Sequence, residues 1–315
     1  MKKFGIAIHG GAGTILESQM TAELRQAYEN ALREALDAGY EVLEKNGTAV
    51  DAVAAATVKL EDNLLFNAGR GSVFTRKGGH EMDASIMEGK ELKAGAVAGV
   101  QHVRNPVALA LAVMQRSDHV FLSGEGAEEF ALEQGMKPEP ASYFFSQFRY
   151  DQWKAVRDSD TYALDHSALE VENLMKNKKF GTVGAVALDV DGNLAAATST
   201  GGMTNKKYGR IGDTPVIGSG TYANNRTAAI SCTGHGELFL RAIAAYDVSA
   251  LMEYKGLSLE EAMHEVVMVK LKAIQGEGGM IGIDAAGNIS MIFNSEGMYR
   301  GVRDSSGRSE IAIFR

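Results

Sequence analysis

The chain has 315 residues, of which 45% are apolar and 23% charged, proportions that exclude wholesale disorder. A formal net charge of −8 and a pI near 5.5 disfavour a nucleic-acid-binding surface or a surface for anionic membranes. The one Cys excludes an intramolecular disulfide, and no apolar run approaches the roughly 20 residues of a membrane span, so we expect a cytoplasmic protein.

The first half of the chain predicts strands and helices in alternation. Residues 4–8 form a strand-length apolar stretch, too short for the core of a signal peptide, and His9-Gly10-Gly11 follows it. Apolar residues at helical spacing predict a helix over 21–45 that stops at Asn46-Gly47. The remaining expectations are a helix at 48–62, a loop at 65–72, strands at 72–75, 82–87, 94–101 and 120–122, and helices at 106–117 and 124–134.

The amino-acid composition changes in the middle of the chain. From about 141 to 180 it is aromatic and then charged and polar, which predicts a solvated linker. The next stretch, 182–188, is strongly apolar and predicts a buried strand. Asp191-Gly192 predicts a hairpin turn into a strand at 194–200.

The last third predicts a second hairpin at 282–291, with helices at about 237–254 and 258–274 before it. Ser258 and Glu261 have the spacing of a capping box at the start of the second helix. Because hairpins rather than crossovers join the strands around the linker, the order favours an α+β sandwich of antiparallel sheets covered by helices.

The common catalytic motifs do not identify a reaction. The chain has neither a Gly-x-Ser-x-Gly elbow nor a Walker A sequence, and no pair of His residues has metal-ligand spacing. Residues 218–223 formally fit a dinucleotide fingerprint, but residues 224–227 do not open a helix, which weakens the case for an oxidoreductase. Cys232 reads as a small core hydrophobe on a strand rather than as a nucleophile.

Hydroxyl groups and glycines concentrate in the second half of the chain. Each cluster has an ordinary structural explanation, because Thr favours strands and an Arg-x-x-Asp pair is also typical of a surface ion pair. Together they supply a candidate nucleophile, hydroxyl donors, glycine amides and a charged clamp. The clusters are Gly181-Thr182-Val183-Gly184, Thr198-Ser199-Thr200-Gly201-Gly202, Gly209-Arg210-Ile211-Gly212-Asp213 and Cys232-Thr233-Gly234-His235-Gly236-Glu237.

These clusters carry a resemblance to the plant-type L-asparaginases, also called isoaspartyl aminopeptidases, of the N-terminal nucleophile (Ntn) hydrolase superfamily. The matching stretches occur in the family's order and spacing over most of the chain. They are Ile8-His9-Gly10-Gly11-Ala12-Gly13, Phe66-Asn67-Ala68-Gly69, 181–187, 197–202, 209–213 and 233–237.

The resemblance implies one Ntn-hydrolase domain over 1–315, built as a four-layer αββα sandwich with two mainly antiparallel sheets between helix layers. It implies a precursor that cuts itself between Gly181 and Thr182 into subunits 1–181 and 182–315, after a mobile linker at about 155–181. Two cleaved protomers would then form an (αβ)₂ assembly. The implied reaction is hydrolysis of β-aspartyl dipeptides and L-asparagine to L-aspartate through an acyl-enzyme.

The resemblance also assigns the catalytic roles. Thr182 is the nucleophile, and its own α-amine serves as the base once it is N-terminal. An unperturbed α-amine has a pKa of about 7.7–8.0, which suits general-base work near neutrality. Thr200 orients the nucleophile or its amine, the Thr233 hydroxyl and the Gly234 N–H form the oxyanion hole, and Asn67 braces the nucleophile.

For the substrate, the resemblance implies that Arg210 binds the α-carboxylate and Asp213 the α-ammonium group, with the Gly236 backbone assisting. An Arg fork matches a planar carboxylate. The remaining residues of the implied substrate site are Asn67, Ile211, Gly212, Thr233, Gly234 and His235, of which His235 is not given a catalytic role.

No zinc, nucleotide or flavin site is expected, because the chain lacks a ligand set for any of them. The loop from 60 to 70 resembles a structural sodium site made of backbone carbonyls. The residues concerned are Leu60, Glu61, Asn63, Phe66, Ala68 and Arg70.

Two alternatives stay open. A glycosylasparaginase shares the same chemistry, and assays on β-aspartyl dipeptides and on glycosylasparagine would separate the two enzymes. A non-catalytic ligand-binding paralogue is disfavoured, because the Thr residues and the Arg/Asp pair are all present.

Overall fold

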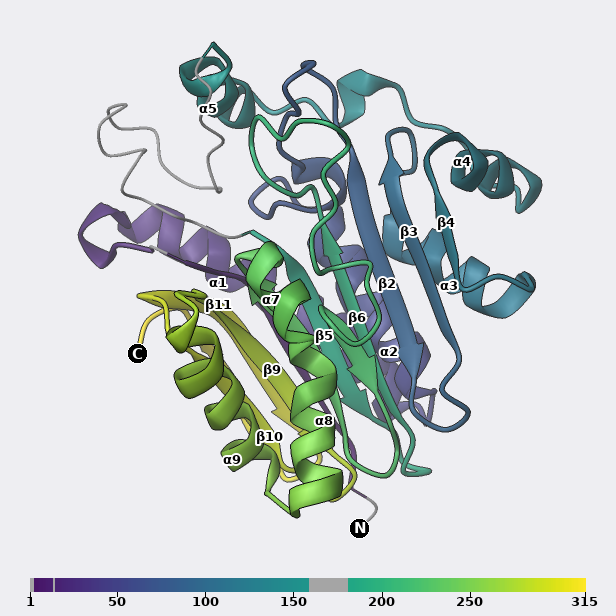
Figure 1. Cartoon of the computed structure of the whole chain (residues 1–315), viewed down its shortest axis with the longest axis vertical. Helices are drawn as coiled ribbons and strands as arrows, with labels where there is room; N and C mark the ends of the chain where they lie inside the picture. The colour runs from purple at the N-terminus through teal and green to yellow at the C-terminus, as the bar shows by residue number, and fades with distance from the viewer. Residues whose placement is uncertain (1–2, 14, 159–180) are drawn as a thin grey trace.

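The computed structural model describes residues 3–13, 15–158 and 181–315 (Figure 1). Within these residues the strands form two sheets. The larger has eight strands in the order β12-β11-β1-β5-β6-β2-β3-β4, and the smaller has four in the order β10-β9-β8-β7. The strands are β1 Gly5–Gly13, β2 Met82–Glu88, β3 Ala94–Val100, β4 Phe121–Ser123, β5 Val183–Leu188, β6 Leu194–Thr200, β7 Thr221–Ala223, β8 Ala228–Gly234, β9 Gly278–Asp284, β10 Ile289–Phe293, β11 Gly297–Asp304 and β12 Ser309–Ala312.

Neighbouring strands pair antiparallel, except for the parallel pair β3–β4 at one edge of the larger sheet. The two sheets pack against each other through β1, β5 and β6 on one side and β8 and β9 on the other. The predicted α+β protein with two mainly antiparallel sheets is therefore confirmed.

Helices pack on each of the two sheets. α1, α2 and α3 pack on the larger sheet, and α8 and α9 pack on the smaller one, as Figure 1 shows. No helix in the described part of the chain is long and apolar enough to cross a membrane. The helices are α1 Ala22–Glu44, α2 Ala49–Glu61, α3 Pro106–Arg116, α4 Gly124–Glu133, α5 Gln147–Val156, α7 Gly236–Ala242, α8 Ala244–Lys255 and α9 Leu259–His264.

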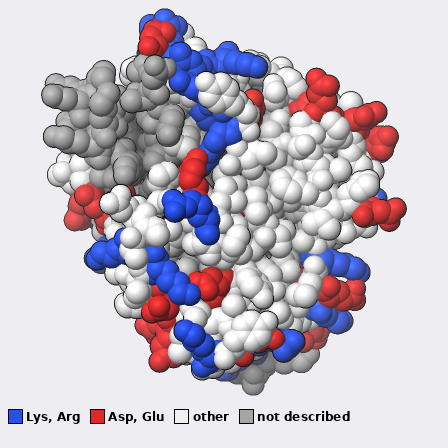
Figure 2. Space-filling view, viewed as in Figure 1, with Lys and Arg blue, Asp and Glu red and all other residues white. Residues whose placement is uncertain are grey.

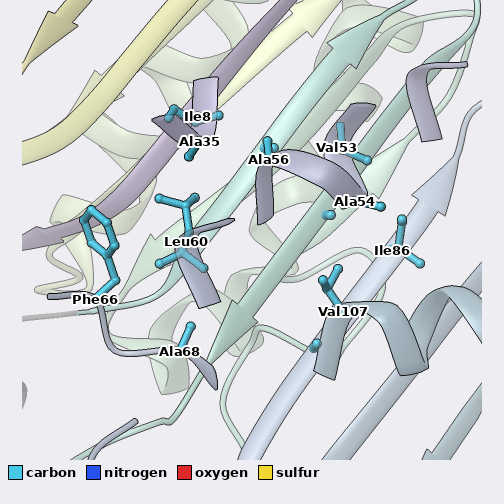
Figure 3. Close-up of a cluster of buried hydrophobic side chains, with 14 of the residues drawn as sticks. Ile8, Ala35, Val53, Ala54, Ala56, Leu60, Phe66, Ala68, Ile86 and Val107 are labelled. Atoms are coloured by element: carbon cyan, nitrogen blue, oxygen red, sulfur yellow. The ribbon is translucent and has the colours of Figure 1, made fainter. Parts of the chain in front are cut away.

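Alternation along the central strands divides the core into separate layers. In β1, Ile6 and Ile8 pack toward α1 and α2, whereas Ala7 faces the smaller sheet. Figure 3 shows the first of these clusters, with Ile8 close to Ala35 and with Leu60 above Phe66. Apolar side chains fill most of the space between the sheets, so polar side chains found there require a separate explanation.

Local sequence signals set the helix starts as predicted. Thr21 and Thr48 cap α1 and α2 through their side-chain oxygens. Ser258 and Glu261 form the expected capping box at the start of α9.

The strand expected at 72–75 is wrong. Its backbone N–H groups bond within a loop instead of joining a ladder: the Val73 N–H donates to Asn67 Oδ1 at 3.0 Å, and the Thr75 N–H donates to the Gly79 carbonyl at 2.8 Å. The β-forming side chains of this segment therefore line a loop.

The reading of 141–180 as a solvated linker is wrong for its first part. Residues 147–156 form α5, whose Trp153 stacks on Phe74 with ring centroids 5.7 Å apart, and Phe144 is fully buried. Aromatic packing thus orders this part of the segment. The rest of the predicted linker, 159–180, lies outside the described residues.

The two helices expected near the C-terminus differ in detail from the prediction. The helix at 237–254 is two helices, α7 and α8, which meet at Ile243 with a φ of +48°. The helix at 258–274 begins as α9 and continues as a π-helix over Glu265–Leu271. Strand β1 runs to Gly13, beyond the predicted end at residue 8.

Candidate active site

Thr182 lies immediately before β5, in the middle of the larger sheet, and its side chain is buried. The adjacent strand β6 ends at Thr200, and the register pairs Val183 with Ser199. The Thr182 hydroxyl donates to Thr200 Oγ1 at 3.2 Å. The structure therefore brings together the predicted nucleophile and the residue predicted to orient it.

The loop after β6 fixes the Thr200 hydroxyl from its other side. The Gly202 N–H donates to Thr200 Oγ1 at 3.0 Å. Asn67 holds this loop by two hydrogen bonds. Its side-chain NH₂ donates to the Gly202 carbonyl at 2.7 Å, and its backbone carbonyl accepts from the Gly201 N–H at 3.0 Å. Asn67 therefore acts on Thr182 indirectly, through this loop and the Thr200 hydroxyl.

His9 is a member of the site that the sequence analysis did not assign. Its Nδ1 lies 3.0 Å from the Thr182 carbonyl, and its Nε2 lies 2.9 Å from Ser231 Oγ. A carbonyl can only accept, so Nδ1 carries the proton and Nε2 accepts from Ser231. Burial lowers the pKa of His9 to about 3, against the opposing effect of the Thr182 carbonyl, so the imidazole is neutral.

A chain of buried hydroxyls continues from His9 between the two sheets. Ser231 Oγ lies 2.7 Å from Thr198 Oγ1, and Thr221 donates to Thr198 at 2.5 Å. Ser85 Oγ lies 2.8 Å from Thr221 Oγ1 and 2.6 Å from the Thr214 carbonyl. These polar residues satisfy one another inside an apolar layer, which fixes the position of the Thr182 carbonyl.

Gly184 allows this arrangement, because it lies directly beneath His9 and Ser231. A Cβ at this position would be 2.7 Å from His9 Nε2 and would collide with Ser231 Oγ. We expect Gly184→Ala to lower the free energy of unfolding by about 1–3 kcal/mol through overpacking, and to slow any chemistry at Thr182. Thermal unfolding measures the first effect. Gly126→Ala is the control, because Gly126 has open space around it and should be neutral or slightly stabilising.

Thr233 lies near the end of β8, on the same face as Ser231, and is fully buried. Its Oγ1 accepts from the Ala12 N–H at 3.3 Å, across the irregularity that β1 has between His9 and Ala12. The hydroxyl proton of Thr233 remains available for donation. Gly234 follows it at the end of the strand, so both predicted oxyanion donors lie at the end of the sheets where Thr182 lies.

Arg210 is held by Glu237, a partner that the sequence analysis did not assign. Arg210 Nε and Nη2 donate to the two Glu237 oxygens, each at 2.8 Å. Burial alone would lower the pKa of Arg210, but Glu237, Asp213 and Asp83 together raise it, so the guanidinium stays charged. His235 Nε2 lies 3.4 Å from the same Glu237 carboxylate.

Asp213 lies beside Arg210 and is almost completely buried. Its Oδ2 has no hydrogen-bond partner among the described residues. Burial raises the pKa of Asp213 to about 7, although Arg210 opposes the shift. Gly236 lies against both side chains, because a Cβ there would be 2.7 Å from Arg210 Nη2 and 2.9 Å from Asp213 Oδ1.

The remaining predicted site residues occupy the edge of this cluster. Gly212 packs beneath the guanidinium, since a Cβ there would be 2.9 Å from Arg210 Nη1, whereas Ile211 is exposed.

Cys232 is fully buried among apolar residues, and burial raises the pKa of its thiol, as expected for a core residue. Residues 218–223 lead into the hairpin β7–β8 instead of a helix, which contradicts a dinucleotide site.

The loop predicted to bind sodium runs from the end of α2 to Gly71. The carbonyl oxygens of Asn63 and Leu64 each lie 3.0 Å from where a Cβ of Gly71 would be. The buried Arg149 guanidinium also enters this loop and donates to the Gly71 carbonyl at 2.9 Å. The described residues contain no group of three or more His, Cys, Asp or Glu that could hold a metal ion.

The other five members of the predicted sodium loop have defined surroundings. Burial raises the pKa of Glu61 to about 8, so its carboxyl is largely protonated at neutral pH; it accepts from Ser199 Oγ at 2.6 Å. The carbonyl of Leu60 accepts from the Asn63 N–H, and that of Ala68 accepts from the Gly71 N–H. The side chain of Arg70 lies over the ring of Tyr143, and Phe66 is buried.

Comparison with known proteins fits this geometry. A protein-family model described as "Asparaginase" matches residues 1–313. The chain is 55% identical to an isoaspartyl peptidase of Salmonella typhimurium over 95% of both chains, and 54% identical to one of Escherichia coli over 95% of this chain and 92% of the relative. It is 40% identical to a probable isoaspartyl peptidase/L-asparaginase 2 of Arabidopsis thaliana over the full length of both. The chain therefore belongs to the asparaginase family.

Proposed function

We propose that this protein hydrolyses β-aspartyl dipeptides and L-asparagine and releases L-aspartate. The observation that carries the proposal is Asp213, a buried carboxyl group beside the Arg210 guanidinium, one oxygen of which has no hydrogen-bond partner among the described residues. A buried acceptor of this kind fits an ammonium ligand, and the neighbouring Arg fits a carboxylate. An L-aspartyl unit presents both groups on one carbon, which leaves its side-chain amide for Thr182.

We further propose that the chain is the precursor of this enzyme. It would be one Ntn-hydrolase domain, a four-layer αββα sandwich that cuts itself into 1–181 and 182–315, with a mobile linker at about 155–181. Packing of α1–α3 on one sheet and of α8 and α9 on the other supports this architecture. A hydroxyl placed at the start of a buried strand, after a glycine that tolerates backbone distortion, supports the position of the cut.

In the mature enzyme the reaction has two halves. The Thr182 α-amine accepts the hydroxyl proton as Oγ1 attacks the β-amide carbon, and Thr233 and Gly234 stabilise the oxyanion. Collapse of the intermediate breaks the C–N bond, the protonated amine gives its proton to the leaving nitrogen, and an ester on Thr182 remains. Water then adds to the ester with the α-amine again as base, and L-aspartate leaves.

The neutral His9 has a positioning role in this scheme. It binds the carbonyl of the nucleophile's own residue at 3.0 Å and is itself fixed by Ser231. Thr200 fixes the Thr182 hydroxyl from the other side. Holding the reacting group in one geometry reduces the entropic part of the activation barrier.

The raised pKa of Asp213 predicts a pH dependence of ligand binding. Only the ionised carboxylate holds an ammonium group, so the affinity for L-aspartate should rise as pH increases to about 7 and level off above it. Below that value the inhibition constant of L-aspartate should increase about tenfold for each unit of pH. Succinate, which lacks the ammonium group, is the control ligand and should not lose affinity between pH 7 and 6.

Three further features stay proposals. We propose an (αβ)₂ assembly, a location in the cytoplasm, and chemistry that needs neither metal nor organic cofactor. A structural sodium ion would take the loop carbonyls of Leu60, Glu61, Asn63, Phe66, Ala68 and Arg70. The carbonyl oxygens of Phe66 and Asn63, two members of this set, both lie close to Gly71, which supports such a donor set.

Parallel assays test the function. We expect the purified, processed protein to release aspartate from a β-aspartyl dipeptide and from L-asparagine, but poorly from glycosylasparagine. Faster release from glycosylasparagine would favour a glycosylasparaginase. Failure to release aspartate from all three substrates would favour the non-catalytic paralogue and would overturn the proposal.

A further inference from the structure

Arg149 is a cation on α5 whose side chain is fully buried. Figure 2 shows exposed Lys and Arg side chains at the upper end of the molecule, where α5 lies in Figure 1, and Arg149 differs from them in lying inside. Burial lowers the pKa of Arg149 to about 10, against the opposing effect of Tyr28 and Tyr299, so the guanidinium stays charged at neutral pH. A buried charge is costly unless it is hydrogen-bonded, so its partners indicate its role.

The guanidinium of Arg149 binds both ends of the loop that runs from residue 65 to residue 71. Its Nε donates to the Gly71 carbonyl at 2.9 Å, and its Nη2 donates to the Leu65 carbonyl at 3.4 Å. Its Nη1 donates to Gln152 Oε1 at 3.3 Å, which fixes the side chain against its own helix. A charged donor makes stronger hydrogen bonds than a neutral one, so this side chain closes the loop. Both carbonyls lie outside the proposed sodium donor set.

Asn67 lies between the two ends of this loop and is fully buried. Its Oδ1 accepts from the Val73 N–H at 3.0 Å, and its NH₂ group donates to the Gly202 carbonyl at 2.7 Å. Its backbone carbonyl accepts from the Gly201 N–H at 3.0 Å. The position of Asn67 relative to the segment after β6 therefore depends on the loop that Arg149 closes.

Helix α5 also contacts the segment after β6. Asn205 Nδ2 donates to the Val156 carbonyl at the end of α5, at 3.0 Å, and the Asn205 N–H donates to the Phe74 carbonyl at 2.8 Å. Trp153 of α5 stacks on Phe74, with ring centroids 5.7 Å apart. The helix that supplies the guanidinium is therefore itself fixed against the segment that Asn67 binds.

We propose that Arg149 is a positioning residue of the reaction centre. Its guanidinium holds the loop that carries Asn67, and Asn67 binds the Gly202 carbonyl. The Gly202 N–H in turn binds the Thr200 hydroxyl, which contacts the Thr182 hydroxyl at 3.2 Å. This inference rests on the proposed function and adds to it a residue outside the stretches that carry the family resemblance. It predicts an effect on the rate of chemistry at Thr182 rather than on substrate binding.

The first test is the kinetics of Arg149→Met, which removes the charge and the donors but keeps a long side chain. We expect kcat for β-aspartyl-leucine, per processed and folded molecule, to fall about 10- to 100-fold, because a small misplacement of a reacting group has an effect of this size. KM should stay within about twofold of wild type, because the clamp lies on another loop. Self-cleavage should slow as well, because it uses the same hydroxyl. Arg149→Lys should lose only about threefold in kcat, because an ammonium group keeps the charge but lacks the fork that reaches both carbonyls.

Two further measurements separate positioning from a general loss of stability. In an Asn67→Ala background, Arg149→Met should cause no additional loss of kcat, because the proposed effect passes through Asn67. Hydrogen–deuterium exchange in Arg149→Met should rise in the segments 65–73 and 200–206 and stay unchanged in the rest of the protein. A merely structural role would raise exchange throughout and leave kcat of the folded molecules unchanged.

The matched control is Arg157→Met, because Arg157 ends the same helix but is exposed and pairs with Asp158 at 3.1 Å. It should keep the wild-type kcat. Wild-type kcat in folded Arg149→Met would overturn the proposal, and so would a full additional loss in the Asn67→Ala background. If Arg149→Met does not fold, wild-type kcat in Arg149→Lys overturns it. Failure of the proposed function is distinguishable, because the wild type would then not hydrolyse the dipeptide.

Discussion

Thr182→Ala is expected to give a full-length chain that releases no measurable aspartate. The substitution removes Oγ1, the atom that we propose attacks the Gly181 carbonyl in the precursor and the substrate amide in the mature enzyme. It also leaves the chain without an N-terminal hydroxyl and amine on the same residue. Denaturing electrophoresis and aspartate release, measured on the same preparation, report both effects.

Thr182→Ser is the matched control, because it keeps a hydroxyl at the position that contacts Thr200 Oγ1 at 3.2 Å. We expect the Ser variant to cut itself and to retain part of the activity. Normal aspartate release by the Ala variant would show that another group is the nucleophile.

Arg210→Ala is expected to lower kcat/KM for β-aspartyl substrates by at least 10- to 100-fold while self-cleavage continues. The bond that we propose is cut, between Gly181 and Thr182, presents no free α-carboxylate or α-ammonium group, so self-cleavage should not need the proposed clamp. Charge-assisted hydrogen bonds contribute roughly 1.5–3 kcal/mol each, which sets the size of the loss. Arg210→Lys should recover only part of it, because an ammonium group cannot form the fork.

The competing explanation is that Arg210 only forms a surface ion pair with Glu237. Arg308→Ala is the control for this case, because Arg308 makes a similar two-armed pair with Glu310, at 3.0 and 2.9 Å, on β12. Its loss should leave kcat/KM unchanged. An Arg210→Ala enzyme that works at the wild-type rate would remove Arg210 from the substrate site.

Much of the fold could be predicted because the signals are local. Thr21 and Thr48 lie directly before helices, as N-cap residues do. The apolar run at 182–188 predicts a buried strand, and the structure has one there. The expected strand at 72–75 was wrong because Asn67 and Gly79 take its hydrogen bonds. A neighbour's side chain decided its conformation, against the β-propensity of the segment.

Helix α5 and the break between α7 and α8 were not predicted, each for its own reason. Residues 147–156 mix aromatic and polar side chains, and the aromatic partner of Trp153, Phe74, is far away along the chain. The left-handed conformation of Ile243 is rare for a β-branched residue, so the break between α7 and α8 had no sequence signal.

Candidate site residues could be named from the sequence where a family pattern covers adjacent residues, as around Thr182 and around Arg210 and Asp213, and their roles stay predictions. Its partners were not, because they are distant in sequence: His9 binds the Thr182 carbonyl across 173 positions and Ser231 across 222. The pairing of Glu237 with Arg210 was not predicted for the same reason, because the two residues are 27 positions apart. His9 and Glu237 both lie within stretches that match the family, which was the one available signal.

Intact-protein mass spectrometry of the purified wild type, under denaturing conditions, tests the central claim most directly. Processing between Gly181 and Thr182 predicts two species with the masses of residues 1–181 and 182–315, the second beginning with Thr182, in a preparation that releases aspartate in its native state. An active protein that remains a single 33.6 kDa chain would contradict the account, because an internal Thr182 has no free amine to act as its base.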